Sequence, residues 1–242
     1  MLKLDAVTIQ FGGLTALKDV SFSMGTDQVV GLVGPNGAGK TTLFNAISGL
    51  VKPSHGQIKF DGSDISRQPL YTRARLGIGR TFQIPQPLHE LTVRENLIVA
   101  QRFGHGKVNH ARIDEILDFM DLSAQAGRDA ATGLALQELK RLEVAKALAT
   151  EPKLLLLDEV LAGLETNAKR YFTAKLEDMH KKFKIGILII EHDIETVSKL
   201  CQRVVVLNFG QVIADGSPEA VFRDPAVITS YTGSVAEGAS HA

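Results

Sequence analysis

Apolar and polar residues follow two periodicities along this chain, one typical of strands and one typical of helices. Positions 2–11 and 20–24 alternate between apolar and polar residues, which predicts strands with one buried face. Near-continuous apolar runs form a second group and suit parallel strands buried on both faces. These runs lie at 29–34, 153–159, 186–192 and 203–208. The chain therefore carries strands of both kinds.

Helical periodicity occupies the segments between these strands. A helix is predicted over 40–48, and a long amphipathic helix over 166–182. From about 84 to 150 the pattern is helical with few strand signals, which predicts an inserted helical subdomain. A strand at 57–62 enters a tight turn at Asp61-Gly62. Alternating strands and helices of this kind predict an α/β fold.

The composition of the chain limits the number of domains and the kinds of partner that we expect. The chain has 242 residues, 44% hydrophobic, which fits one large domain over 1–235 and a flexible, small and polar tail over 236–242. The 27 basic and 27 acidic residues balance, so we expect no nucleic-acid partner, and Arg73, Arg75 and Arg80 are expected on a solvated face. One cysteine excludes an intramolecular disulfide and suits a reducing cytoplasm. The apolar runs are too short to span a bilayer, so a membrane role requires a partner.

The most specific motif is a glycine-rich loop between a predicted strand and a predicted helix. GPNGAGKTT fits the pattern G-x-x-x-x-G-K-[ST] of a phosphate-binding loop. Its candidate nucleotide ligands are Gly34, Pro35, Asn36, Gly37, Ala38, Gly39, Lys40, Thr41 and Thr42. The glycines let backbone N–H groups face a phosphate, Lys40 reaches the β- and γ-phosphates, and Thr41 offers a hydroxyl to Mg²⁺. We predict ATP as the ligand and Mg²⁺ as the cofactor.

Polar side chains at the ends of other strands are candidates for hydrolysis. Asp158 and Glu159 end the run LLLLDE, where Asp158 can hold Mg²⁺ and Glu159 can accept a proton from attacking water. His192 ends another apolar run and can sense the γ-phosphate and orient water. Gln83 ends a short strand and can contact both Mg²⁺ and the water. The plainer alternatives are acids that cap a strand, a structural histidine and an exposed loop glutamine.

An aromatic residue upstream of the loop is a candidate for the base. Phe11 lies 23 residues before the loop, where its ring can stack on adenine. The alternative is an ordinary core phenylalanine.

Taken together, these motifs resemble the ATPase subunits of ABC transporters over nearly the whole chain, about 2–233. GPNGAGKTT corresponds to Walker A, LLLLDE to Walker B, Gln83 to the Q-loop, AGLE (162–165) to the D-loop and His192 to the switch. Within that family the chain is similar to the first ATPase of branched-chain amino acid importers. The shared segments include FGGLTALKDVSF, GIGRTFQ, LTVRENLIVAQ and GSPEAVFRDPAVITSYTG.

This resemblance implies a fold, partners and a location. The fold is a P-loop ATPase core with an antiparallel β-subdomain and an inserted helical subdomain. Two ATPase subunits pack head to tail around two ATP molecules, and a permease docks in a groove near Gln83 formed partly by IPQPLHELTV (84–93). A substrate-binding protein delivers the cargo indirectly. The subunit is peripheral, on the cytoplasmic face of the membrane.

The chain departs from this family at the signature motif, which binds the partner's ATP. The usual serine is Ala135 and the usual second glycine is Gln137. Loss of the hydroxyl and crowding of an N–H contact should cost on the order of 1–3 kcal/mol. This favours a heterodimer with one weaker site, with a homodimer as the alternative. Equally, Gln137 is tolerated if its side chain turns away or bonds phosphate itself.

Other functions remain open beside import of branched-chain amino acids. A regulatory subunit that binds ATP but hydrolyses it weakly fits Gln137, although the intact Glu159 argues against it. Other amides, urea or aromatic acids are alternative cargoes. A soluble ABC ATPase of ribosomes or DNA repair usually carries tandem domains or a long coiled coil, and this sequence has one domain and no heptad run.

Overall fold

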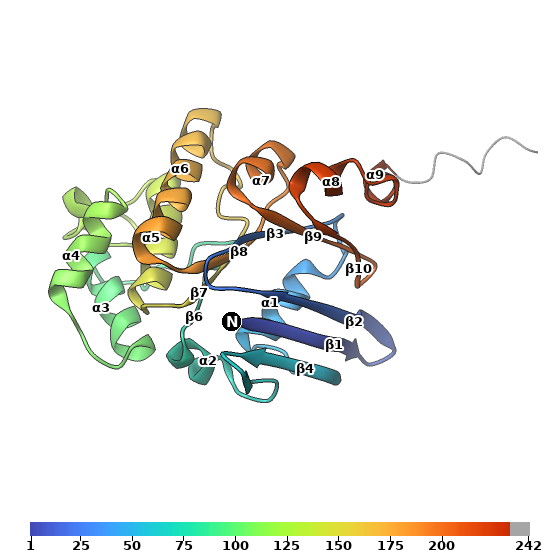
Figure 1. Ribbon diagram of the computed structural model, residues 1–242. Coiled ribbons are helices and arrows are strands. Elements are labelled where there is room, and N and C mark those ends of the chain that lie inside the picture. Colours follow the sequence, from blue (N-terminus) through green and yellow to red (C-terminus); the bar gives the residue numbers. More distant parts are fainter. Residues whose placement is uncertain (233–242) are drawn as a thin grey trace, which may run out of the picture.

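The computed structural model describes residues 1–232, which form two β-sheets and a group of helices beside them (Figure 1). The larger sheet has the strand order β10-β9-β3-β8-β7-β6, in which only β10 is antiparallel to its neighbour. Its strands are β3 (Val29–Val33), β6 (Ile78–Arg80), β7 (Leu154–Asp158), β8 (Gly186–Ile190), β9 (Arg203–Asn208) and β10 (Gln211–Gly216). The tail predicted over 236–242 lies outside the described residues.

The smaller sheet is antiparallel and has the order β2-β1-β4-β5. Its strands are β1 (Leu2–Phe11), β2 (Leu14–Met24), β4 (His55–Phe60) and β5 (Ser63–Asp64). In Figure 1 it lies below the larger sheet, with α1 (Lys40–Ser48) between the two. The prediction of an α/β core with an antiparallel β-subdomain is confirmed.

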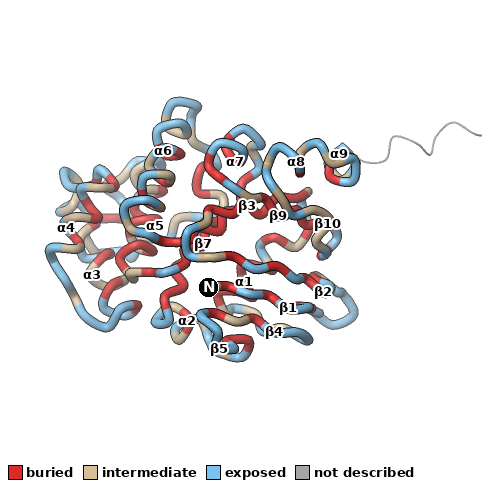
Figure 2. Tube along the Cα trace, viewed as in Figure 1, coloured by how far each residue is buried: buried red, intermediate tan, exposed pale blue. Residues whose placement is uncertain are grey.

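The buried strands of the larger sheet divide the core into two parts. Every residue of β3, β7 and β8 is buried, and successive side chains point to opposite faces. Val30 and Leu32 pack with α1 and the smaller sheet, whereas Val29 and Val33 pack with the helices on the other face. Figure 2 shows this continuous buried centre running between exposed outer helices. These strands therefore form a rigid frame for the loops at their carboxyl ends.

The helical block lies at one side of the molecule, on the left in Figure 1. It contains α3 (Val93–Gly104), α4 (His110–Phe119), the short 3₁₀ helix η1 (Ser123–Gln125) and α5 (Leu136–Ala149). A capping box of Thr92 and Glu95 starts α3, because each side chain bonds the other residue's backbone N–H. The other helices are α2 (Leu70–Leu76), α6 (Thr166–Phe183), α7 (Ile194–Leu200), α8 (Pro218–Phe222) and α9 (Pro225–Thr232). None of the helices within residues 1–232 is both long enough and apolar enough to cross a membrane.

Two expectations from the sequence are wrong in detail. The strands expected to end at Gln83 and His192 are shorter: β6 ends at Arg80 and β8 at Ile190, so both residues lie in the loops that follow. The basic cluster is not a solvated face: Arg73 is fully buried and the Arg80 side chain is 5% exposed, while Arg75 alone is exposed. Their guanidinium groups are buried because backbone and side-chain oxygens surround them, which a sequence pattern cannot show.

Candidate functional site: a glycine-rich loop, a cavity and an adjoining carboxylate

The phosphate-binding loop connects β3 to α1, and its glycines are required by backbone geometry. Gly34, Gly37 and Gly39 have φ angles of 146°, 80° and 102°, in the region that L side chains rarely adopt. A Cβ on Gly34 would lie 2.0 Å from the Leu207 carbonyl oxygen. Only glycine therefore fits this loop, which leads into the N-terminus of α1, where free N–H groups favour anions.

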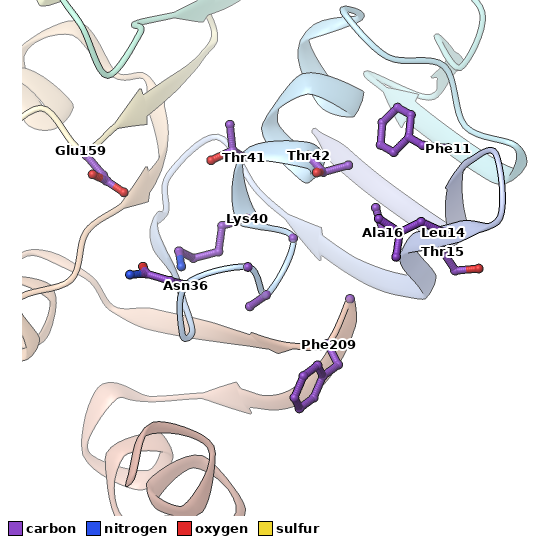
Figure 3. Close-up of a pocket in the computed structure, with 14 residues that line it drawn as sticks. Phe11, Leu14, Thr15, Ala16, Asn36, Lys40, Thr41, Thr42, Glu159 and Phe209 are labelled. Carbon is purple, nitrogen blue, oxygen red and sulfur yellow. The ribbon is translucent and has the colours of Figure 1, made fainter. Parts of the chain in front are cut away.

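A cavity of about 480 Å³ opens beside this loop (Figure 3). It is lined by Phe11, Leu14, Thr15, Ala16, Asn36, Gly37, Ala38, Gly39, Lys40, Thr41, Thr42, Glu159, Phe209 and Gly210. Figure 3 shows Phe11 and Glu159 at opposite ends, with Lys40 and Thr41 between them. Phe11 is 50% exposed, so it is not a core residue, and its ring is open to a flat ligand. The cavity thus has an aromatic end, a phosphate-binding middle and an acidic end.

The Lys40 ammonium is buried beside this loop. It donates to the carbonyl oxygens of Gly34 (2.7 Å) and Pro35 (2.9 Å). Burial lowers the pKa of Lys40, while Glu159 and Asp158 oppose this shift. Gly34 and Pro35 do not line the cavity themselves; their carbonyls hold Lys40 at its edge.

Glu159 bonds the side chains of both Gln83 and His192, which come from different strand ends. Gln83 donates from Nε2 to Oε2 of Glu159 over 2.6 Å, and His192 Nε2 lies 2.7 Å from Oε1. The three residues named as candidates from separate motifs are thus in direct contact. A carboxylate held on both oxygens is oriented for proton transfer at the end of the phosphate-binding cavity.

Asp158 lies at the end of β7 and is buried next to Arg80. Its Oδ2 atom is 3.5 Å from the Arg80 guanidinium, which also donates to Ser48 Oγ over 2.8 Å. Burial raises the pKa of Asp158, with Arg80 acting in the opposite direction. Thr41, Gln83 and Asp158 supply a hydroxyl, an amide and a carboxylate, and such oxygen donors fit Mg²⁺.

Glu191 precedes His192 and is buried, with 5% of the residue exposed. Its Oε1 accepts the N–H of Leu161 over 3.0 Å, which ties the loop after Glu159 to the end of β8. Burial raises the pKa of Glu191 to about 7 from an ordinary value of 4.5. Sequence reasoning missed this residue, because a glutamate before a histidine carries no signal of burial.

The raised pKa of Glu191 predicts a pH-dependent stability. The folded state holds the proton more tightly than the unfolded state, so stability falls as pH rises from about 4.5 through about 7. Glu191→Gln removes this titration and keeps an acceptor for Leu161. Urea unfolding at pH 5 and pH 8 should show the wild type losing on the order of 2 kcal/mol relative to the variant. Equal pH dependence in both proteins would contradict the burial argument.

The signature residues lie away from this cavity. Ala135 precedes α5 and Gln137 lies in its first turn, both exposed, and neither lines the nucleotide cavity. The Glu138 carboxylate accepts the N–H of Ala135 over 2.8 Å, whereas the alanine methyl cannot cap the helix in return. Gln137 instead lines a separate cavity of about 150 Å³ with Leu164 and residues of α6. Within one chain, the structure does not bring the signature and the phosphate loop together.

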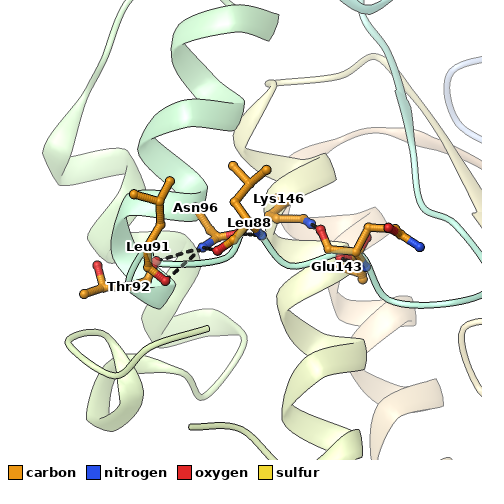
Figure 4. A network of polar contacts seen from close by, with 7 residues as sticks. Leu88, Leu91, Thr92, Asn96, Glu143 and Lys146 are labelled. Atoms are coloured by element: carbon orange, nitrogen blue, oxygen red, sulfur yellow. Dashed lines mark hydrogen bonds and ion pairs between the residues drawn. The ribbon is translucent and has the colours of Figure 1, made fainter. Parts of the chain in front are cut away.

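The segment 84–93 is exposed over much of its length but fixed to the helical block (Figure 4). Glu143 of α5 accepts the N–H of Gln86 over 2.8 Å, and Lys146 donates to the carbonyl of Gln86. Asn96 accepts the N–H of Leu88 over 2.8 Å and donates to backbone carbonyls of the same segment. Ile84 is 71% exposed. The segment exposes two large apolar side chains, Ile84 and Leu88, among polar ones, and hydrogen bonds fix its backbone to the helices.

Sequence reasoning also missed several residues that line the cavity. Leu14, Thr15 and Ala16 come from the start of β2, and Phe209 and Gly210 from the turn between β9 and β10. Phe209 is 88% exposed and has a φ angle of 44°. A lone apolar residue in a turn is an available signal, but only the fold places it beside the phosphate loop.

Comparisons with known proteins agree with this geometry. The profile of a family described as "ABC transporter" matches residues 17–162, and that of "Branched-chain amino acid ATP-binding cassette transporter" matches residues 211–237. The high-affinity branched-chain amino acid transport ATP-binding protein BraF of Pseudomonas aeruginosa is 38% identical, covering 96% of this chain and 98% of its own. The lipopolysaccharide export system ATP-binding protein LptB of Haemophilus influenzae is 35% identical, with 90% of each chain covered.

A solved structure carries the same fold. The ADP conformation of MJ1267, an ATP-binding cassette of an ABC transporter, superposes with a TM-score of 0.86 and 32% identity. The superposition covers 96% of this chain and 98% of that one. A nucleotide-binding pocket, a carboxylate poised beside it and these relatives all point to one family.

Proposed function

The chain belongs to the family of ABC transporter ATP-binding subunits, and on that premise we propose that it hydrolyses ATP to drive uptake of branched-chain or related hydrophobic amino acids. ATP hydrolysis is the activity of this family. The proposed substrate is supported by the match of residues 211–237 to the branched-chain amino acid transporter profile, together with the likeness to BraF. LptB, whose name assigns it to lipopolysaccharide export, is 35% identical, so overall likeness alone does not fix the cargo, and other amides or aromatic acids stay as alternatives.

In this proposal ATP lies along the cavity from its aromatic end to its acidic end. Phe11 stacks on adenine, the N–H groups of the loop and the start of α1 bind the phosphates, and Lys40 leaves its carbonyl partners to reach the β- and γ-phosphates. Thr41, Gln83 and Asp158 are the residues that would hold Mg²⁺. When bound, Mg²⁺ neutralises charge on the phosphate oxygens.

Hydrolysis requires a water in line with the γ-phosphate. Glu159 takes one proton from this water while the new P–O bond forms, and the bond to the β-phosphate oxygen breaks to leave ADP and phosphate. His192 and Gln83 orient the Glu159 carboxylate, since each contacts one of its oxygens. His192 also faces the γ-phosphate in this arrangement.

The proposed assembly contains a second ATPase subunit and a membrane permease. A head-to-tail pair would place Ala135 and Gln137 against the partner's ATP, which accounts for their distance from this chain's own cavity. The exposed segment 84–93 would receive a permease helix, and a substrate-binding protein would act only through the permease. The subunit would then be peripheral, on the cytoplasmic face of the membrane.

Uptake by cells tests the cargo. Cells that lack this subunit should lose high-affinity leucine uptake and regain it with the wild-type chain but not with Glu159→Gln. Full leucine uptake without the subunit would overturn the proposed cargo, and competition by other amides or aromatic acids would then identify the alternative. Recovery with Glu159→Gln would instead overturn the proposed role of hydrolysis.

The signature residue Gln137 carries a separate prediction. A heterodimer with one weakened site predicts that Gln137→Gly raises ATP turnover by the assembled transporter about tenfold, because a crowded phosphate contact costs on the order of 1–3 kcal/mol. Gln137→Ala is the matched control, because it also removes most of the glutamine side chain but does not give the backbone the conformational freedom of glycine. Steady-state phosphate release measures both.

Unchanged rates in both variants would mean that the glutamine is accommodated. The cavity it shares with Leu164, Tyr171 and Phe172 offers the side chain a place away from the phosphate. A low rate in every variant, with tight nucleotide binding, would favour the alternative of a regulatory subunit with weak hydrolysis.

A further inference from the structure

A buried lysine on α5 contacts the two segments that carry the proposed catalytic pair. Lys140 is 5% exposed, and its ammonium donates to the carbonyl oxygens of Gln83 and Glu159, each over 3.2 Å. The side chains of Gln83 and Glu159 also bond each other. One ammonium group therefore links the main chains of two residues whose side chains must meet.

The backbone of Glu159 needs such a restraint. Its φ angle is 49°, in the left-handed region, which is strained for a residue with a side chain. A strained conformation of this kind persists only where its surroundings fix it. Here the N–H of Glu159 donates to the carbonyl of Ile190 over 3.0 Å, and its carbonyl accepts from Lys140. Lys140 thus holds one of the two backbone groups that define the direction of the carboxylate.

Lys140 is one of several α5 side chains that form hydrogen bonds with the backbone of residues 83–86. Glu143 and Lys146 lie three and six residues further along the helix, and both bond the backbone of Gln86 (Figure 4). The same helix begins at Leu136, immediately after Ala135 of the signature. A shift of the helix start is therefore carried by a continuous rigid element to the backbone of Glu159.

The buried Lys140 ammonium lies among acidic side chains. Burial lowers the pKa of Lys140, and the nearby carboxylates of Glu191, Glu159, Glu143 and Asp158 oppose that shift.

We propose that Lys140 is a positioning residue that fixes the catalytic carboxylate of Glu159 and couples it to the signature end of α5. The inference rests on the proposed role of Glu159. Lys140 would then link the two ATP sites of a dimer. When the partner's nucleotide binds at this chain's signature, α5 would shift, and Lys140 would change the position of Glu159 in this chain's own site.

Lys140→Met tests the proposal, because it keeps the length of the side chain and removes the donor. In the assembled transporter we expect kcat to fall about tenfold or more while KM for ATP stays within about twofold, the pattern of a lost transition-state interaction. In the isolated subunit, amide hydrogen exchange over residues 159–164 should accelerate about tenfold, without nucleotide. Lys140→Leu, which also lacks a donor, serves if the methionine variant does not fold, and the same pattern is expected.

Lys175→Met is the matched control. The Lys175 side chain is 18% exposed and donates to a backbone carbonyl, that of Phe119 over 2.6 Å, and it does not line the cavity beside the phosphate loop. It should keep kcat within about twofold. Unchanged kcat in the Lys140 variants, or an equal loss in Lys175→Met, would overturn the proposal. Turnover by Glu159→Gln, measured in parallel, would show instead that the role assigned to Glu159 has failed.

Discussion

Replacing Glu159 by glutamine should lower ATP turnover by the assembled transporter about 10²- to 10⁴-fold, the range for loss of a general base. Glutamine keeps the size of the side chain and can still bond Gln83 and His192, but its amide has no basicity to accept a proton from water. The phosphate-binding loop is untouched, so the affinity for ATP should stay within about threefold. Phosphate release and equilibrium binding of a fluorescent ATP analogue measure the two effects separately.

Glu177→Gln provides the same chemical change on an exposed helix face. Glu177 pairs with Lys181 on α6, its side chain is 44% exposed, and its substitution should leave turnover within about twofold. If Glu159→Gln keeps more than about a tenth of the wild-type rate, the proton must go elsewhere. Weak ATP binding by Glu159→Gln would instead indicate that the residue organises the pocket rather than the attacking water.

The parts of the site that the sequence predicts are those specified by a few adjacent residues. The phosphate loop needs glycine at Gly34 and Gly39 because the chain must turn without a Cβ, so its chemistry is visible in the letters themselves. Asp158 and Glu159 follow an apolar strand, and strand ends of a parallel sheet meet at one edge. From this rule alone, contact of Glu159 with residues from two other strand ends was foreseeable.

The sequence does not predict which basic residues are buried, because their burial depends on contacts with residues distant along the chain. Lys140 looks like a solvent-facing lysine of an amphipathic helix, and its burial follows from carbonyls 57 and 19 residues away. Arg80 is buried because β6 lies beside β7 and places it at Asp158. A basic residue in a helical or strand pattern is normally exposed, so only the assembled fold identifies these exceptions.

Arg73 is the clearest such exception and should have the largest effect on stability. It is fully buried, and its guanidinium donates to the carbonyl oxygens of Ala46, Ile47, Ser66 and Gln68. Burial lowers the pKa of Arg73 to about 10, so it remains charged at neutral pH. The cation lies at the negative C-terminal end of α1, the helix whose N-terminus follows the phosphate loop.

Arg73→Met should therefore lower the free energy of unfolding by about 3–5 kcal/mol, because several buried carbonyls lose their donors together. Arg75→Met on the same helix is the control: Arg75 is exposed and lies over the Tyr71 ring, and its substitution should change stability by less than about 0.5 kcal/mol. Urea unfolding of both variants decides the matter. A loss below about 1 kcal/mol in Arg73→Met would mean that water replaces the guanidinium at these carbonyls. The end of α1, and with it the phosphate loop, would then be stabilised by packing rather than by this cation.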